Sequence, residues 1–192
     1  MICMLLYAVA LYPQSGNDDT RRRIYIDEFL AYYQEAYEKH NMVFLEKFFS
    51  CDALIITETK KLVKYGKELV PHTTKKSSYE YIVENKRQYL ARLRKIFDAN
   101  PRIKISIPNG KKFIARHRMY KEIYGVSFLQ MWSDSHNGSN IEDDMLGYVF
   151  LIIDFKQNEK TPIIHVRTWQ PQSNVKCSTD KFNLYDFEIY DF

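Results

Sequence analysis

Residues 27–57, DEFLAYYQEAYEKHNMVFLEKFFSCDALIIT, carry two helical patterns that lead directly into a strand pattern. Up to His40-Asn41, apolar and aromatic side chains recur at helical spacing, at Leu30, Tyr33, Ala36 and Tyr37. Residues 42–49 have a crowded apolar face, and residues 53–57 form an apolar, partly β-branched run of strand length. This stretch therefore predicts a helix pair followed by a strand.

A long helix is predicted after Ser77. The sequence Ser77-Ser78-Tyr79-Glu80 has the capping-box pattern, in which a Ser is followed three residues later by a Glu. Asn100-Pro101 ends the helix, since proline cannot continue it. Apolar residues at helical spacing form the expected buried stripe: Ile82, Tyr89, Leu93, Ile96 and Phe97. Residues 59–76, with six Lys and no clear period, predict a partly extended loop or an irregular hairpin.

The chain after Pro101 has strand patterns. Residues 103–107 alternate apolar and polar, and Asn109-Gly110 is a favoured two-residue hairpin turn, so residues 113–120 are expected to return beside them. Residues 123–132 predict a long strand, and residues 146–155 are apolar enough for a central strand buried on both faces. Residues 162–170 predict the last strand.

Helices first and a run of strands afterwards indicate an α+β fold. The expected architecture is an N-terminal helix pair and one long helix packed on a curved, mainly antiparallel sheet. The chain is expected to form one domain over residues 17–176, and residues 177–192, where rings alternate with acids, are expected to dock on it.

The helix pair with its strand, and the later segments YGVSFLQMW and GYVFLIIDF, resemble the nuclear transport factor 2-like superfamily. This is the cystatin-like cone of ketosteroid isomerase and scytalone dehydratase, and the resemblance covers residues 24–171. The segments IYGVSFLQMW and IIHVRTWQP look like those of uncharacterised exported Bacteroidetes members. The resemblance implies a pocket at the wide end of the cone and a homodimer through the outer face of the sheet.

The composition is that of one folded domain: 192 residues, 45% hydrophobic, with 12 Phe, 15 Tyr and 2 Trp. The net charge of +4 arises from 28 basic and 24 acidic residues, and the basic clusters are interleaved with acids, so we expect no nucleic-acid binding. Cys51 and Cys177 are too few for a disulfide framework or a zinc site. We expect both to be buried, with a disulfide between them as the alternative in an exported chain.

Residues 1–16 are uncharged and hold an apolar run over residues 2–11, which is too short to span a membrane. With the small-x-small pattern Ala8-Val9-Ala10, they predict a signal peptide and an exported protein, periplasmic or secreted. No Lys or Arg precedes the run. Either the true start lies upstream, or this segment is an N-terminal element packed on the core.

The densest polar group of the sequence lies on the last predicted strand. Alternation along a strand places His165, Arg167 and Trp169 on one face. Arginine can grip a carboxylate with two hydrogen bonds, tryptophan can stack and histidine can exchange a proton, so these residues predict a site for an anionic or aromatic ligand. The alternative is an outer face with cross-strand ion pairs or a dimer contact.

Tyr124, Gln130 and Trp132 share a face of the strand over residues 123–132 and could add hydrogen-bond donors and a stacking wall. Asp143-Asp144 lack a third oxygen ligand at useful spacing, so no metal site is expected. The phosphate-binding, metalloprotease and nucleophile-elbow motifs are also missing, and we expect no cofactor.

Two function classes follow. The favoured one is a non-catalytic domain that binds a small molecule or a protein. The alternative is a pocket enzyme of the isomerase, dehydratase or cyclase type, with Asp154 or His165 as the base and Tyr124 or Tyr148 as the donor. A turn contact or an ion pair to Arg167 is the competing role for Asp154.

Overall fold

The structure is a computed structural model that describes residues 15–60, 62–65, 68–71, 79–108, 110, 112–134 and 146–175. The predicted signal peptide up to residue 14, the docking segment 177–192, Asp143-Asp144 and Cys177 lie outside these residues. No helix in the described ranges combines the length and the apolar character needed to cross a membrane.

The main sheet has seven strands. Six follow one another in the order β4 (Tyr79–Asn85), β1 (Phe49–Lys60), β9 (Ile163–Pro171), β8 (Leu146–Asp154), β7 (Ile123–Asp134) and β5 (Ile103–Ser106). The seventh, β6 (Lys112–Arg116), also pairs with β7. Only β1 and β9 run parallel; the other pairs in this sheet are antiparallel. β2 (Leu62–Tyr65) and β3 (Glu68–Pro71) form a separate antiparallel hairpin.

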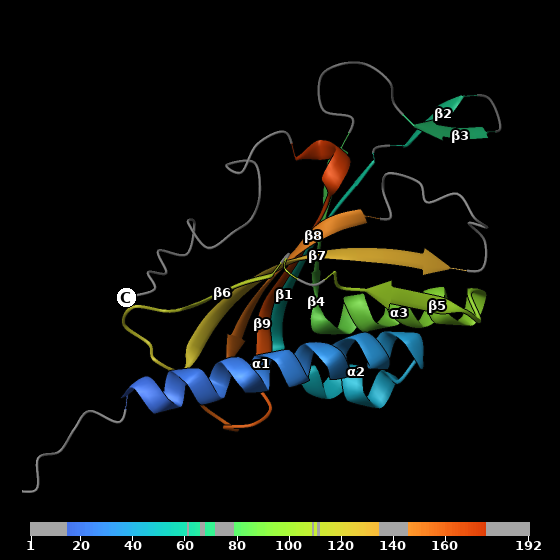
Figure 1. The fold of residues 1–192 in the computed structure, drawn as a ribbon. Coiled ribbons are helices and arrows are strands. Elements are labelled where there is room, and N and C mark those ends of the chain that lie inside the picture. The colour runs from blue at the N-terminus through green and yellow to red at the C-terminus, as the bar shows by residue number, and fades with distance from the viewer. Residues whose placement is uncertain are drawn as a thin grey trace, which may run out of the picture.

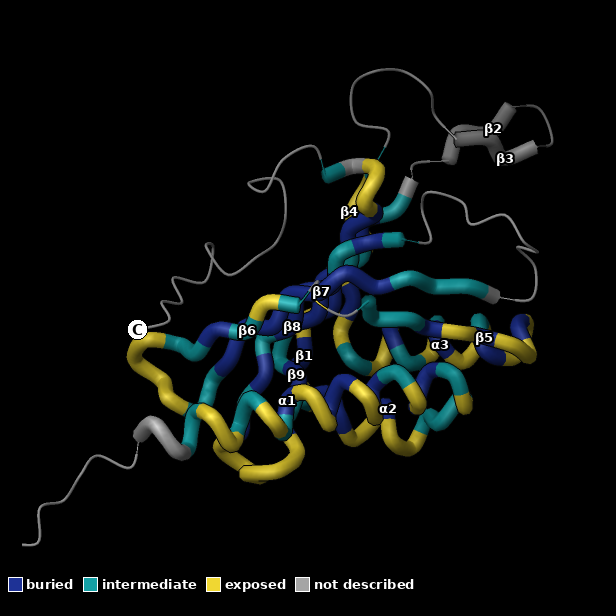
Figure 2. Tube along the Cα trace, in the orientation of Figure 1, coloured by how far each residue is buried: buried dark blue, intermediate teal, exposed yellow. Residues whose placement is uncertain are grey.

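Three helices lie on one side of the main sheet (Figure 1): α1 (Ser15–Glu38), α2 (Met42–Phe48) and α3 (Lys86–Ala99). Buried segments gather where these helices meet the strands (Figure 2). The core there is rich in aromatic side chains, because the helical stripe of α1 points its rings at the sheet: Phe29, Tyr33 and Tyr37 pack with Phe48 and Phe128. The expected α+β architecture is confirmed.

The predicted start of the long helix is wrong. Tyr79–Asn85 is strand β4, which pairs with β1 along its whole length, and α3 begins only at Lys86. A different capping box forms there: the Asn85 side chain accepts from the Gln88 backbone N–H, and the Gln88 side chain accepts from that of Asn85. Pairing with β1 satisfies the backbone of residues 79–85, a gain that local sequence does not reveal.

The predicted hairpin around Asn109-Gly110 is also wrong. β5 and β6 do not pair with each other; β5 pairs with residues 131–134 of β7 and β6 with residues 124–128. Gly110 does adopt the left-handed conformation of a turn residue, with φ of 75°. The 12 residues of β7 offer an edge long enough for both short strands, so the turn moves the chain along this edge.

Cys51 is exposed, contrary to the expectation of burial. It lies in the first part of β1, where the pairing with β9 is irregular between Phe49 and Leu54. Such an irregularity interrupts the alternation of inward and outward side chains, so residue parity does not predict burial in this segment.

The buried stripe of α3 gives a stability prediction. Leu93 is buried against the core, so Leu93→Ala should lower the free energy of unfolding by about 2–5 kcal/mol. The matched control is Arg94→Ala, one residue further on the exposed side of α3, with an expected change within about 0.5 kcal/mol. Urea unfolding of both variants measures the difference, and equal losses would contradict this orientation of α3.

Candidate functional site

A cavity of about 390 Å³ lies between α3 and the face of the sheet that the helices cover. Four elements contribute its walls: Thr57 and Thr59 from β1, Tyr89, Arg92, Leu93 and Ile96 from α3, Gln130 and Trp132 from β7, and Arg167 and Trp169 from β9. The volume falls in the range of about 300–1,000 Å³ that is typical of ligand sites. No Asp, Glu or His is among these described lining residues.

Gly147 makes room beside the cavity. It pairs with Gln130 on one side, and a Cβ at this position would lie 2.6 Å from Cζ2 of the Trp169 ring. That is far closer than a side chain allows, so only glycine lets the Trp169 indole lie across β8. The sequence shows Gly147 only as one small residue in an apolar strand.

Arg167 lines the cavity and is buried, with only 6% of its surface exposed. Its Nε donates a hydrogen bond to the Tyr33 hydroxyl at 3.1 Å, and its guanidinium carbon lies 5.4 Å from the ring centroid of Tyr89. The Tyr89 hydroxyl in turn is hydrogen-bonded to that of Tyr37. A charged group from β9 is therefore held by aromatic side chains from α1 and α3.

Arg92 reaches the same ring from α3, with its guanidinium carbon also 5.4 Å from the Tyr89 centroid. Unlike Arg167, it has an acidic partner: Nε and Nη2 both donate to the Glu84 carboxylate, with Nε at 2.8 Å from Oε1. Nη2 also lies 3.4 Å from the Thr57 hydroxyl. The ion pair of Arg92 and Glu84 joins α3 to β4, the strand that the sequence analysis predicts to be part of a helix.

The sequence predicts that His165, Arg167 and Trp169 share one face of β9. This is correct for Arg167 and Trp169 and wrong for His165. The register of β8 and β9 shifts between Ile152 and Ile153, so that Ile164 and Arg167 share the buried face. This bulge places an extra residue in β9 and turns His165 to the opposite face.

Asp154 and His165 contact each other away from the cavity. His165 Nε2 lies 3.4 Å from Asp154 Oδ2, and its Nδ1 lies 4.0 Å from Asp52 Oδ1. Asp154 Oδ1 accepts a hydrogen bond from the Lys156 backbone N–H at 2.7 Å. The turn contact expected for Asp154 is confirmed, whereas the ion pair with Arg167 is not formed.

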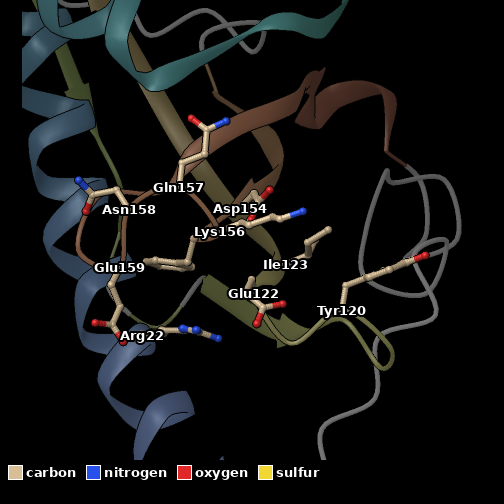
Figure 3. A pocket seen from close by; sticks show the side chains of 10 residues that line it. Arg22, Tyr120, Glu122, Ile123, Asp154, Lys156, Gln157, Asn158 and Glu159 are labelled. Carbon is tan, nitrogen blue, oxygen red and sulfur yellow. The ribbon is translucent and has the colours of Figure 1, made fainter.

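Asp154 also lines a larger hollow of about 690 Å³, shown in Figure 3. Its polar side chains come from the start of α1, the segment before β7 and the turn between β8 and β9. Several of these charges already have partners: Arg22 Nη1 donates to the Lys121 carbonyl, and Glu159 pairs with Arg21. The rings that line this hollow are those of Tyr120 and Phe155, and none of its charged lining residues is buried as Arg167 is.

The shared face of Tyr124, Gln130 and Trp132 is confirmed, but these residues do not meet at one site. Gln130 and Trp132 line the cavity. The Trp132 ring packs edge-on to the Tyr37 ring, with 6.2 Å between the ring centroids. Tyr124 lies at the other end of β7, where its hydroxyl donates to Asp19 of α1 at 2.8 Å. A strand of this length brings residues of one face to different neighbours.

Solved structures with a similar fold support the same architecture. A structure of Bdellovibrio bacteriovorus Bd1075 matches with a TM-score of 0.56 and 13% identity over 83% of this chain, which spans 44% of the Bd1075 chain. A scytalone dehydratase-like protein from Novosphingobium aromaticivorans matches with a TM-score of 0.55 and 9% identity, over 81% of this chain and 87% of its own. A cystatin-like protein of unknown function from Nostoc punctiforme has a TM-score of 0.50 and 8% identity, over 80% and 93% of the two chains.

The chain has the nuclear transport factor 2-like fold. The resemblance inferred from the helix pair and the later strands is thereby confirmed at the level of fold. No protein-family model and no curated protein matches the sequence.

The sequence did not indicate that several of the residues lining this cavity belong to one site. Thr57 and Thr59 lie in β1, and Tyr89 belongs to the predicted buried stripe. Arg92 lies on the polar side of the predicted helix, where charge is usually solvated. The only feature in the sequence that these residues share is regular spacing along α3 or β1. This spacing does not show that α3 and β1 face each other.

The contact between Tyr124 and Asp19 predicts a pH dependence. Burial, together with the hydrogen bond to Asp19, raises the pKa of Tyr124 from 10.0 to about 12. The folded protein holds this proton more tightly than the unfolded chain. The resulting stabilisation is therefore complete below pH 10 and is lost as the pH rises towards 12.

Tyr124→Phe should remove this dependence. Urea unfolding of wild type and variant across this alkaline range should show a difference in stability that is largest at the lower pH and shrinks as the pH rises. A difference that stays constant would mean that Tyr124 ionises equally easily in the folded and unfolded chains.

Proposed function

We propose that this protein is a non-catalytic binding domain whose ligand, a small molecule, occupies the cavity between α3 and the sheet. The observation that carries the proposal is the cavity itself. Phe29, Tyr33 and Phe128 fill the space under α1, whereas space remains under α3, beside Gly147. Both tryptophans of the chain line this space.

The lining favours binding over acid–base catalysis. General acid–base catalysis needs a group that gains and loses a proton near neutral pH, usually a carboxylate or an imidazole. The described cavity walls contain neither, and Asp154 and His165 are on the opposite face of β8 and β9. Export and a homodimer through the outer sheet face stay predictions from the sequence and the resemblance.

Tryptophan fluorescence gives a direct test, because the tryptophan emission of this protein comes only from Trp132 and Trp169. We expect at least one member of a probe panel of benzoate, cinnamate and their primary amides to change this emission saturably. Calorimetry should give one site per chain. If no probe produces heat or a change in emission, the proposal is wrong for small aromatic molecules.

A pair of variants at Thr59 locates the binding. Thr59→Phe places a ring in the cavity and should weaken binding by about tenfold or more, whereas Thr59→Val has nearly the same shape and should bind like wild type. Thermal unfolding of both variants checks that they fold. Equal binding by the two would place the ligand elsewhere.

A further inference from the structure

The charge on Arg167 is not balanced by any described residue. Arginine keeps its proton in proteins, so the side chain is a buried cation. No described carboxylate lies within 4.0 Å of its guanidinium; its contacts are the Tyr33 hydroxyl and the Tyr89 ring. A buried cation without an anionic partner is costly, and such groups are usually paired.

The surrounding hydroxyls do not supply the missing negative charge. Burial raises the pKa of Tyr37 well above its ordinary value, and burial likewise raises the pKa of Tyr89. Both phenols are therefore neutral at neutral pH. The hydrogen bond from Arg167 to Tyr33 satisfies one N–H and leaves the positive charge in place.

The neighbouring arginine does not change this balance. Arg92 is matched by Glu84, which accepts from both its Nε and its Nη2, so the two charges cancel. Arg92, Glu84 and Arg167 thus sum to one positive charge, which is located on Arg167.

The unsatisfied part of Arg167 borders the cavity. Among the described residues, only Tyr33 accepts a hydrogen bond from this guanidinium, and it uses Nε. Both Nη groups are left to donate. Two Nη groups in a plane match the two oxygens of a carboxylate, a geometry that a lysine ammonium lacks.

Polar and aromatic groups for the rest of a ligand border the same space. The Gln130 side chain is 1% exposed, and its Oε1 has no hydrogen-bond partner in the described part of the chain. Trp132 and Trp169 add flat apolar surfaces. Indole faces pack well against planar rings.

The geometry points to a small aromatic monoanion as the ligand, with its carboxylate paired to Arg167 and its ring against the tryptophans. This inference rests on the proposed function and adds the charge and chemical class of the ligand. It also sets the charge of the ligand. One uncompensated cation favours a monoanion, because a second carboxylate on the same molecule would find no unpaired cation among the described lining residues.

Matched probes test the charge. Benzoate and benzamide have nearly the same shape but differ in charge, as do cinnamate and cinnamamide. We expect the carboxylates to bind about tenfold or more tightly than the amides. Terephthalate, a dianion, should bind more weakly than benzoate. Carboxylates and amides that bind equally would overturn the inference and leave the proposed function intact; a panel that does not bind would overturn both.

Variants at Arg167 test whether this residue is the cation that pairs with the ligand carboxylate. Arg167→Lys keeps the charge but not the planar fork, and should weaken carboxylate binding by about tenfold to a hundredfold. Arg167→Gln should abolish the preference for carboxylate over amide. The control is Arg94→Gln on the exposed side of α3, which removes one positive charge outside the cavity and should leave the preference unchanged.

Thermal unfolding supplies a readout that does not depend on ligand. If Arg167 lacks a partner, Arg167→Gln should melt at the same temperature as wild type or higher, since removing an uncompensated buried charge relieves a cost. Benzoate should raise the melting temperature of wild type and leave that of Arg167→Gln unchanged. A large loss of stability in Arg167→Gln, with unchanged carboxylate preference in Arg167→Lys, would assign Arg167 a purely structural role.

Discussion

The hydrogen bond between Arg167 and Tyr33 links the two layers of this protein. Tyr33 lies in α1, packs its ring on Phe128 of the sheet and accepts from the guanidinium at 3.1 Å. The ring of Tyr89, from α3, lies with its centroid 5.4 Å from the carbon of the same guanidinium. Because one polar group on β9 contacts both helices, the orientation of the helices and the position of the charge depend on each other.

Two local features of the sheet shape the cavity walls next to this charge. The bulge opposite Ile152 keeps Ile164 and Arg167 on the buried face, and it turns His165 towards Asp154 on the other face. Gly147 removes a side chain where the Trp169 ring lies. The cavity and the pair of Asp154 and His165 thus lie on opposite faces of the sheet, and the described cavity lining contains no carboxylate and no imidazole.

The likeness to these solved structures concerns the fold of the backbone. At identities of 8–13% the elements superimpose, while the side chains in the cavity are free to differ. One fold can host unrelated activities, so the scytalone dehydratase-like neighbour does not bring its chemistry to this chain. The cavity of this chain is lined by two guanidiniums and two indoles, and among the described residues only the guanidinium of Arg92 has an acidic partner.

The sequence by itself determined the fold class, because helical spacing in residues 27–49 and apolar strand runs such as residues 146–155 reflect which faces must be buried. It also marked Arg167, Trp169, Gln130 and Trp132 as candidates. Tertiary structure alone decided that Tyr79–Asn85 is a strand, that β5 and β6 both pair with β7, and that His165 leaves the group. These outcomes depend on pairing between distant segments, whose hydrogen bonds and register override local capping, turn and alternation signals.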